Sequence, residues 1–294
     1  MTAERQVACR LGKRELGRHA YEDQMPSRIA AMIDQEDDRN KLHGAILKLA
    51  SLLQEDRNVV SAYLCTASVV QVCKLKNEGG HFCGYRNIQM LWSSMQRYPV
   101  RHSSPVSEEV PPISAVQAMI ETAWDKGFNA HGRLATGGIK GTRKHVGTSE
   151  VEALMLSLDI ACIGHAFSGK NAWLALLDFV EKYFVRSSKT SGSDSVTQSE
   201  LPPLFLQRPG HSMTIVGFEK DIKGRRRLLV FDPAWSPPSV VRPSSGQVGT
   251  SSNWSRYWAL KMYRKDERYL KRHQAFELLE LDGADPTKNG SLGG

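Results

Sequence analysis

The sequence of 294 residues is 40% hydrophobic and 24% charged, which is typical of a globular protein and excludes a disordered or fibrous chain. Its length can bury a large core and suits one catalytic domain with appendages. No apolar run approaches the 18 residues of a membrane span, and the charged residues 1–5 lack the apolar core of a signal peptide. We therefore expect no membrane partner.

The net charge of +8 raises the question of nucleic-acid binding. Basic residues are nevertheless dispersed among acidic ones, and the densest cluster, residues 225–227, falls in a predicted turn. We interpret the charge as a solvated basic surface and expect no nucleic acid as a partner.

The five cysteines, at positions 9, 65, 73, 83 and 162, are scattered, odd in number and form no C-x-x-C pair. This pattern indicates a reducing compartment, the cytosol or the nucleus, and argues against structural zinc. The histidines at 81, 102, 131, 145, 165 and 273 show no metal-ligand spacing, so we expect neither a metal ion nor a cofactor.

The predicted elements begin with two helices near the N-terminus. Ser27 is placed to cap the first helix, and the second is expected over residues 39–53. Residues 59–75 are apolar and β-branched, which predicts a short strand or a helix, and its two cysteines are expected to be structural.

A cysteine flanked by glycines follows. Ile88, Leu91, Trp92 and Met95 recur at helical spacing, which predicts a helix over residues 84–95 with one buried face. Cys83 then lies at the helix N-terminus, where unpaired N–H groups stabilise a thiolate. Glycines at 79, 80 and 84 let a substrate backbone approach the sulfur. A buried structural cysteine is the alternative.

Further helices are predicted at 113–126, 149–158, 171–184 and 254–270, and strands at 158–163 and 275–281. The run Ser-Glu-Val-Glu at 149–152 indicates a capping box at the start of the helix over 149–158. Polar or Pro-, Gly- and Ser-rich loops are expected at 98–112, 132–147, 186–200 and 236–253. Helices first and an antiparallel sheet later predict an α+β fold.

A hairpin is predicted between the loops expected at 186–200 and 236–253. The apolar runs 214–218 and 228–231 flank a polar turn, so His211 at the start of one strand meets Asp232 at the end of the other. His211 follows Cys83 by 128 residues (211 − 83), and Asp232 follows His211 by 21 (232 − 211). Papain-type cysteine peptidases run Cys, His, Asn or Asp in this order, with a first gap of about 130–150 residues.

Longer boxes strengthen this interpretation. They read CGYRNIQM at 83–90, GHSMTIVG at 210–217 and FDP at 231–233, with further similar runs at 116–128, 140–142 and 146–151. Over residues 60–282 the chain resembles the papain-like cysteine peptidase family of the zinc-finger ubiquitin peptidase and the ubiquitin-fold-modifier proteases. The modifier proteases carry Asp-Pro-His, whereas Asp232 and Pro233 are followed here by Ala234, so the ubiquitin-peptidase branch is the more similar. That branch has Gly-Trp-Gly before the cysteine, where this chain has Gly80-His81-Phe82.

The resemblance implies a papain-like fold with helices packed on a central, mostly antiparallel sheet. It also implies that Cys83 is the nucleophile, His211 its base and Asp232 the residue that orients the imidazole. Gln207 corresponds to a family glutamine that assists the oxyanion, with a surface glutamine as the alternative. Glu150 corresponds to an acidic contact for the arginine-bearing tail of ubiquitin, with a glutamate favoured by the helix dipole as the alternative.

His145 stands where the family has a Trp beside that acidic contact, and Asn129 stands where it has an Asp. From the resemblance we expect a deubiquitinase that cleaves after the C-terminal Gly of ubiquitin, with chains linked through lysine sixty-three preferred. A protease of another ubiquitin-like modifier and a non-catalytic ubiquitin-binding module are the alternatives.

The expected organisation is an N-terminal helical arm at 1–57, a catalytic domain at 58–282 and a disordered tail at 283–294. The arm either contacts a distal ubiquitin or packs on the catalytic domain. We expect a monomer whose partner is ubiquitin or polyubiquitin.

Overall fold

The computed structural model describes residues 17–95, 109–186, 195–242 and 252–281. In this part of the chain a large sheet has the order β4-β10-β6-β7-β2-β5, with β8 paired to β7 and β9 to β8. All pairs are antiparallel except β2 with β5. The strands are β2 (Val59–Leu64), β4 (Cys162–Ser168), β5 (Val196–Gln198), β6 (Leu204–Arg208), β7 (His211–Asp221), β8 (Arg226–Phe231), β9 (Arg264–Asp266) and β10 (Ala275–Leu281).

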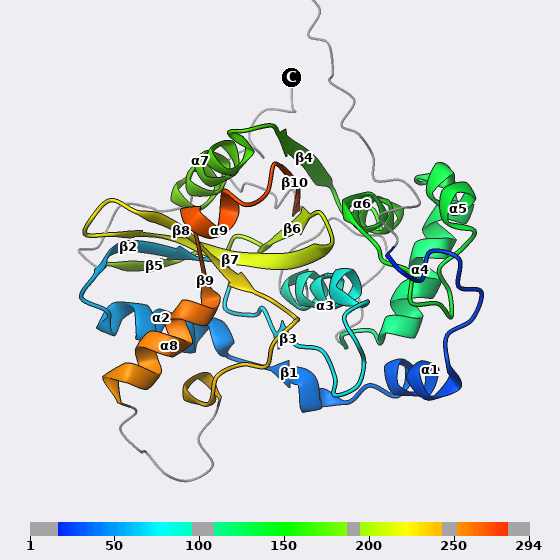
Figure 1. Ribbon diagram of the computed structural model, residues 1–294, viewed down its shortest axis with the longest axis horizontal. Coiled ribbons are helices and arrows are strands. Elements are labelled where there is room, and N and C mark those ends of the chain that lie inside the picture. Colours follow the sequence, from blue (N-terminus) through cyan, green and yellow to red (C-terminus); the bar gives the residue numbers. More distant parts are fainter. Residues whose placement is uncertain (1–16, 96–108, 187–194, 243–251, 282–294) are drawn as a thin grey trace, which may run out of the picture.

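Helices cover both faces of this sheet (Figure 1). In the view of Figure 1, α7 lies above the sheet, α2 and α8 lie below it, and α1, α4, α5 and α6 gather to the right of α3. The helices are α1 (Ser27–Asp34), α2 (Ala45–Glu55), α3 (Cys83–Met95), α4 (Ile113–Asp125), α5 (Ala130–Thr136), α6 (Thr148–Ser157), α7 (Ala172–Val185), α8 (Asn253–Tyr263) and α9 (Glu267–Leu270). The short strands β1 (Lys41–Leu42) and β3 (Gln71–Val72) form a separate pair. The expected α+β class is confirmed.

Helix α3 lies between two hydrophobic cores. Met90 belongs to the core formed with the sheet, whereas Ile88, Leu91 and Trp92 belong to the core formed with α1, α4 and α6. Every residue of α3 after Cys83 is buried, so the prediction of a single buried face is wrong. The polar residues of α3 are accommodated by partners from other segments, which local periodicity does not reveal.

The N-terminal helices pack on the rest of the chain. Leu49 and Leu53 of α2 belong to the core of the sheet, and Ile33 of α1 belongs to the core beside α3. Packing, one of the two alternatives for the arm, is therefore observed in its described part. Two details of the prediction are wrong: the Ser27 side chain caps nothing, and the second helix begins only after Gly44, whose φ is +70°.

Four other predicted boundaries are wrong. Part of the loop expected at 132–147 is helix α5, and the strand expected at 158–163 is the later, largely exposed β4. The helix expected at 254–270 is interrupted by β9, because residues 264–266 pair with β8. Strand β5 occupies residues 196–198 of the loop expected at 186–200, so that prediction is wrong there. Residues 98–108, 187–194 and 243–251 of the expected loops, and the tail after residue 281, lie outside the described residues.

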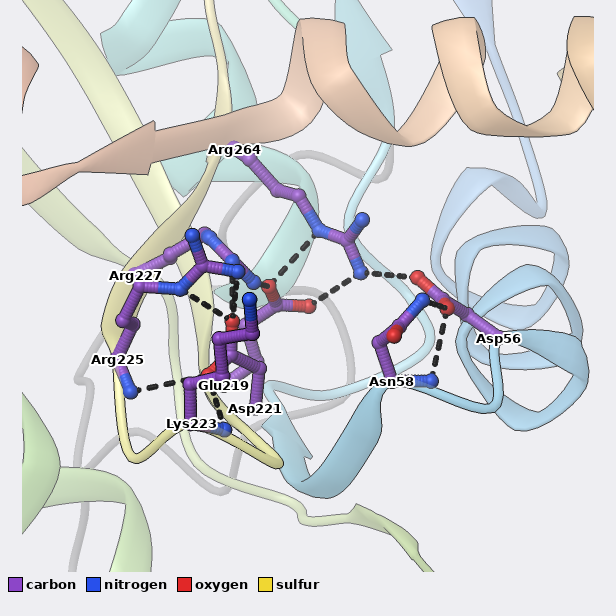
Figure 2. Close-up of polar contacts among 8 residues, drawn as sticks. All are labelled: Asp56, Asn58, Glu219, Asp221, Lys223, Arg225, Arg227 and Arg264. Atoms are coloured by element: carbon purple, nitrogen blue, oxygen red, sulfur yellow. Dashed lines mark hydrogen bonds and ion pairs between the residues drawn. The ribbon is translucent and has the colours of Figure 1, made fainter.

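The basic cluster at 225–227 spans the end of the turn after β7 and the first two residues of β8, and acidic residues compensate its charge (Figure 2). Arg227 pairs with Glu219 and Asp221, which are 0% and 2% exposed. Arg264 also reaches Glu219, at 2.8 Å. Burial raises the pKa of Asp221, but hydrogen bonds from Arg225 and other partners outweigh this effect and hold the pKa below its ordinary value. The expectation of a solvated basic surface is wrong for Arg227, whose side chain is 14% exposed.

No helix among the described residues is both long and apolar enough to cross a membrane.

Candidate active site

Cys83 is the first residue of α3, as the sequence predicts. Gly84 beside it lies under a neighbouring loop: a Cβ atom at Gly84 would come within 2.5 Å of the carbonyl oxygen of Val146. Real Cβ atoms do not approach an oxygen so closely, so only glycine lets the loop over residues 141–147 rest on the first turn of α3. Cys83 is thus placed between a helix terminus and this loop.

His211 and Asp232 come together at the end of the hairpin. His211 is the first residue of β7 and Asp232 follows the last residue of β8, and the antiparallel pairing of these strands makes the two ends neighbours. His211 Nε2 lies 2.8 Å from Asp232 Oδ1. The same carboxylate oxygen accepts the backbone N–H of Ala234 at 3.0 Å, and Lys265 Nζ lies 3.6 Å from the other oxygen. The carboxylate therefore holds the imidazole in one orientation.

The electrostatics favour a thiolate–imidazolium pair. Burial raises the pKa of Cys83, but the hydrogen bond and charge of His211, with hydrogen bonds from Ser212, lower it below its ordinary value. Burial lowers the pKa of His211, but hydrogen bonds with Asp232 and Cys83 raise it to about 9. Burial also opposes ionisation of Asp232, whose pKa is nevertheless lowered by His211. All three shifts therefore favour the charged forms, which are thiolate, imidazolium and carboxylate.

A buried polar network that the sequence analysis missed supports these groups. Asn87 donates from Nδ2 to the carbonyl oxygen of Cys83 at 2.7 Å and to Ser212 Oγ at 3.1 Å. Thr214 Oγ1 donates to Asn87 Oδ1 at 2.7 Å. The sequence signal was the pair of hydroxyl residues at alternate positions of one strand, which places both on the same face of β7. This network joins α3 to β7, the two elements that carry Cys83 and His211.

Gln207 lies on β6 directly opposite Ser212, whose hydroxyl and backbone bond Cys83. Its side chain is buried, its Nε2 donates to the carbonyl oxygen of Arg208 at 3.1 Å, and its Oε1 has no hydrogen-bond partner among the described residues. The structure thus brings Gln207 to the strand beside His211 but does not bond its amide to Cys83. Its role at the oxyanion stays a prediction.

Glu150 acts as a helix cap. Helix α6 begins at Thr148, and the Glu150 carboxylate accepts the backbone N–H of Gly147 and the hydroxyl of Ser149, both at 2.9 Å. The capping box predicted over residues 149–152 is therefore wrong, because the N-cap is Gly147, which has no side chain to accept a hydrogen bond, and the glutamate that caps the helix is Glu150. Burial raises the pKa of Glu150. The local alternative to substrate binding is thus observed, and the substrate contact of Glu150 stays a prediction.

The remaining predicted site residue, His145, lies with its ring centroid 5.9 Å from that of His81, two residues before the nucleophile. The described cysteines, at 65, 73, 83 and 162, are free thiols, and those at 65 and 73 are buried, as expected for structural residues. In the described part of the chain, no group of three or more His, Cys, Asp or Glu side chains is arranged to hold a metal ion.

Comparisons with known proteins point to one family. The sequence profile of peptidase family C78 matches residues 58–279. Zinc finger-containing ubiquitin peptidase 1 of Mus musculus is 30% identical over 270 residues, which cover 90% of this chain and 45% of that protein. The protein of the same description from Rattus norvegicus is 32% identical over 270 residues, with the same coverage. The chain thus spans about half the length of these curated relatives.

Two further proteins are also similar to this chain. Ubiquitin carboxyl-terminal hydrolase mug105 of Schizosaccharomyces pombe is 34% identical over 162 residues, which cover 52% of this chain and 60% of that protein. The crystal structure of UfSP from C. elegans shares 16% identity and has a TM-score of 0.48, covering 83% of this chain and 37% of that chain. In the structure, Cys83 lies at the N-terminus of α3, and His211 is the first residue of β7 in the adjacent, mostly antiparallel sheet.

Proposed function

The chain belongs to peptidase family C78, and on that premise we propose that it hydrolyses the peptide or isopeptide bond after the C-terminal Gly of ubiquitin. The observation that carries the proposal is the pairing of His211 with Asp232 at 2.8 Å beside a cysteine whose pKa is lowered. The names of the sequence relatives, ubiquitin peptidases of mouse and fission yeast, support ubiquitin as the substrate.

The reaction follows from the charges of the three groups. The Cys83 thiolate attacks the carbonyl carbon of the terminal Gly and forms a C–S bond. The tetrahedral intermediate collapses when the C–N bond breaks, and His211 gives its proton to the departing amine. Water then attacks the thioester, His211 takes its proton, and breaking of the C–S bond restores the thiolate. Asp232 keeps the imidazole oriented and stabilises its charged form throughout.

The developing oxyanion needs donors near the start of α3. The Cys83 backbone N–H is unpaired within the helix because it lies in the first turn. We assign the second donor to the side-chain amide of Gln207, which is buried on the strand beside His211. We assign Glu150 and His145 to the approach of the substrate tail. A preference for chains linked through lysine sixty-three belongs to this proposal on the resemblance alone.

A second candidate substrate is the ubiquitin-fold modifier. The observation that favours it is His81, which departs from the Trp usual in the ubiquitin-peptidase branch two residues before Cys83. A non-catalytic ubiquitin-binding module is the weaker alternative. Such a module needs neither the pairing of His211 with Asp232 nor a neighbouring cysteine whose pKa is lowered.

The test is labelling with ubiquitin that carries a C-terminal electrophile, beside an equivalent probe of the ubiquitin-fold modifier. A covalent adduct with ubiquitin that is lost in Cys83→Ala supports the proposal. An adduct with the other probe alone moves the substrate to that modifier and keeps the three catalytic residues. Folded protein that reacts with neither probe overturns the catalytic proposal in favour of the binding module.

We further propose residues 58–282 as the catalytic unit, residues 1–57 as an arm on it and residues 283–294 as a tail. On the use of cysteine we place the protein in the cytosol or the nucleus. We propose that it acts as a monomer on ubiquitin or polyubiquitin, without nucleic acid.

A further inference from the structure

Three histidines from separate segments meet beside the nucleophile. His19 Nε2 lies 3.2 Å from His81 Nε2, and the two rings are at an edge-to-face angle of 86°. His145 lies on another side of His81, with ring centroids 5.9 Å apart. All three side chains are partly exposed, as is Cys83, so the cluster borders solvent. Neither the catalytic groups nor any hydrophobic core accounts for it.

The cluster adjoins the reacting groups on two sides. His81 lies two residues before Cys83, and the charge of His211 acts on His145. The residue after His145, Val146, places its carbonyl oxygen over Gly84 in the first turn of α3. A peptide that brings its C-terminal carbonyl to Cys83 from this side therefore passes the rings of His81 and His145.

The segment that supplies His19, residues 17–25, is anchored to the loop that supplies His145. Glu22 accepts the backbone N–H of Arg143 at 2.7 Å and its Nε at 2.9 Å. Met25 donates its backbone N–H to the carbonyl oxygen of Gly141 at 2.8 Å, and its side chain is buried. Because of these hydrogen bonds, residues 17–25 form a fixed wall of the site rather than a mobile lid, since lids are weakly held segments.

Gly17 brings this segment close to His145. Its φ is +81°, and a Cβ atom there would lie 2.7 Å from His145 Cε1. The backbone at Gly17 therefore lies against the ring of His145, while the side chain of His19 holds His81. One short segment thus restrains both histidines that border the nucleophile.

We propose that residues 17–25 complete the substrate site, with His19 as a positioning residue that holds His81 against the C-terminal tail of the modifier. This inference rests on the proposed function and names the part of the site that determines affinity for the tail. His19 acts through His81 and takes no part in the chemistry. The ligand is an extended peptide ending in glycine, whose narrow backbone fits between a wall of imidazole rings and the helix terminus.

The test is steady-state kinetics with whichever modifier labels Cys83, carrying a fluorophore at its C-terminus. We expect His19→Ala to raise KM about 3- to 10-fold, the factor for loss of one hydrogen bond, with kcat within about 2-fold. His19→Gln keeps a side-chain amide that can bond His81 and should restore most of the affinity. The matched control is His43→Ala, which removes an exposed histidine from the turn before α2.

Alkylation of Cys83 by iodoacetamide is measured in parallel, because this small reagent reaches the thiol without contacts to residues 17–25 or His81. Its rate should be the same in all four proteins. An unchanged KM in His19→Ala overturns the inference, a lower KM shows that the segment covers the site instead, and slower alkylation shows that His19 acts on the nucleophile. If the wild type cleaves neither modifier, the proposed function has failed. If the wild type cleaves one of them and His19→Ala has the same KM, only this inference has failed.

Discussion

The buried ion cluster around Arg86 offers the sharpest test of how the fold positions the nucleophile. Arg86 is 0% exposed and lies in the first turn of α3, where its backbone N–H bonds the carbonyl oxygen of Phe82. Its Nη1 lies 2.7 Å from Glu36 Oε1, and its Nε donates to Glu78 Oε1 at 3.2 Å. Gln89 accepts from Nη1 at 2.9 Å. The cluster joins α3 to segments on both sides of it.

Replacing Arg86 with Met would leave two carboxylates, with side chains only 2% and 1% exposed, without their cation. Removing one partner of a buried ion pair costs about 3–5 kcal/mol, because the remaining charge stays desolvated. A domain of ordinary stability has about 5–15 kcal/mol in total. Arg86→Met should therefore lose a large part of the free energy of unfolding. This loss is compared with the loss caused by breaking an exposed ion pair.

Urea unfolding followed by the fluorescence of the buried Trp92 and Trp124 measures this loss. Glu78→Gln is the milder variant that should fold, since Arg86 keeps Glu36. The control is Arg39→Met, because Arg39 and its partner have side chains 82% and 48% exposed and should contribute less than about 1 kcal/mol. The reasoning is refuted if Arg86→Met and Arg39→Met lower the free energy of unfolding equally.

Three further predictions concern the reaction itself. Asp232→Asn should lower kcat by about 10²- to 10⁴-fold, because the imidazole loses its charged partner. Circular dichroism should show that the variant is still folded, whereas unfolding would assign Asp232 a structural role. In the proposed reaction the imidazolium of His211 is the acid, so kcat/KM should fall as pH rises through about 9, the pKa of His211. The rate of Cys83 alkylation should fall only when the pH drops below the lowered pKa of the Cys83 thiol. An alkylation midpoint at the pH of an ordinary thiol contradicts the ion pair. Gly84→Ala should lower kcat/KM at least about 10-fold because its Cβ would displace the loop over α3, whereas Gly80→Ala has open space and should retain activity; equal effects would exclude that clash.

The positions of the three proposed catalytic residues were predictable because local signals fix each of them. A glycine-flanked cysteine before a helical pattern places Cys83 at a helix terminus, and two apolar runs around a polar turn bring His211 to Asp232. These inferences need only short stretches of sequence and the geometry of a hairpin. The same approach misplaced β4, because none of its residues is fully buried and its pairing with β10 joins residues far apart in the chain.

The residues that position the nucleophile were less visible than the nucleophile itself. Arg86 and Asn87 look like the polar face of an amphipathic helix, since periodicity records only which positions are apolar. They are buried because Glu36 and Thr214, distant in sequence, supply their partners. His19 is a parallel case, since nothing near position 19 predicts His81 as its neighbour. A sequence read locally therefore yields the reacting atoms, whereas the groups that hold those atoms emerge only when the chain is folded, and it is their replacement that tests the site most directly.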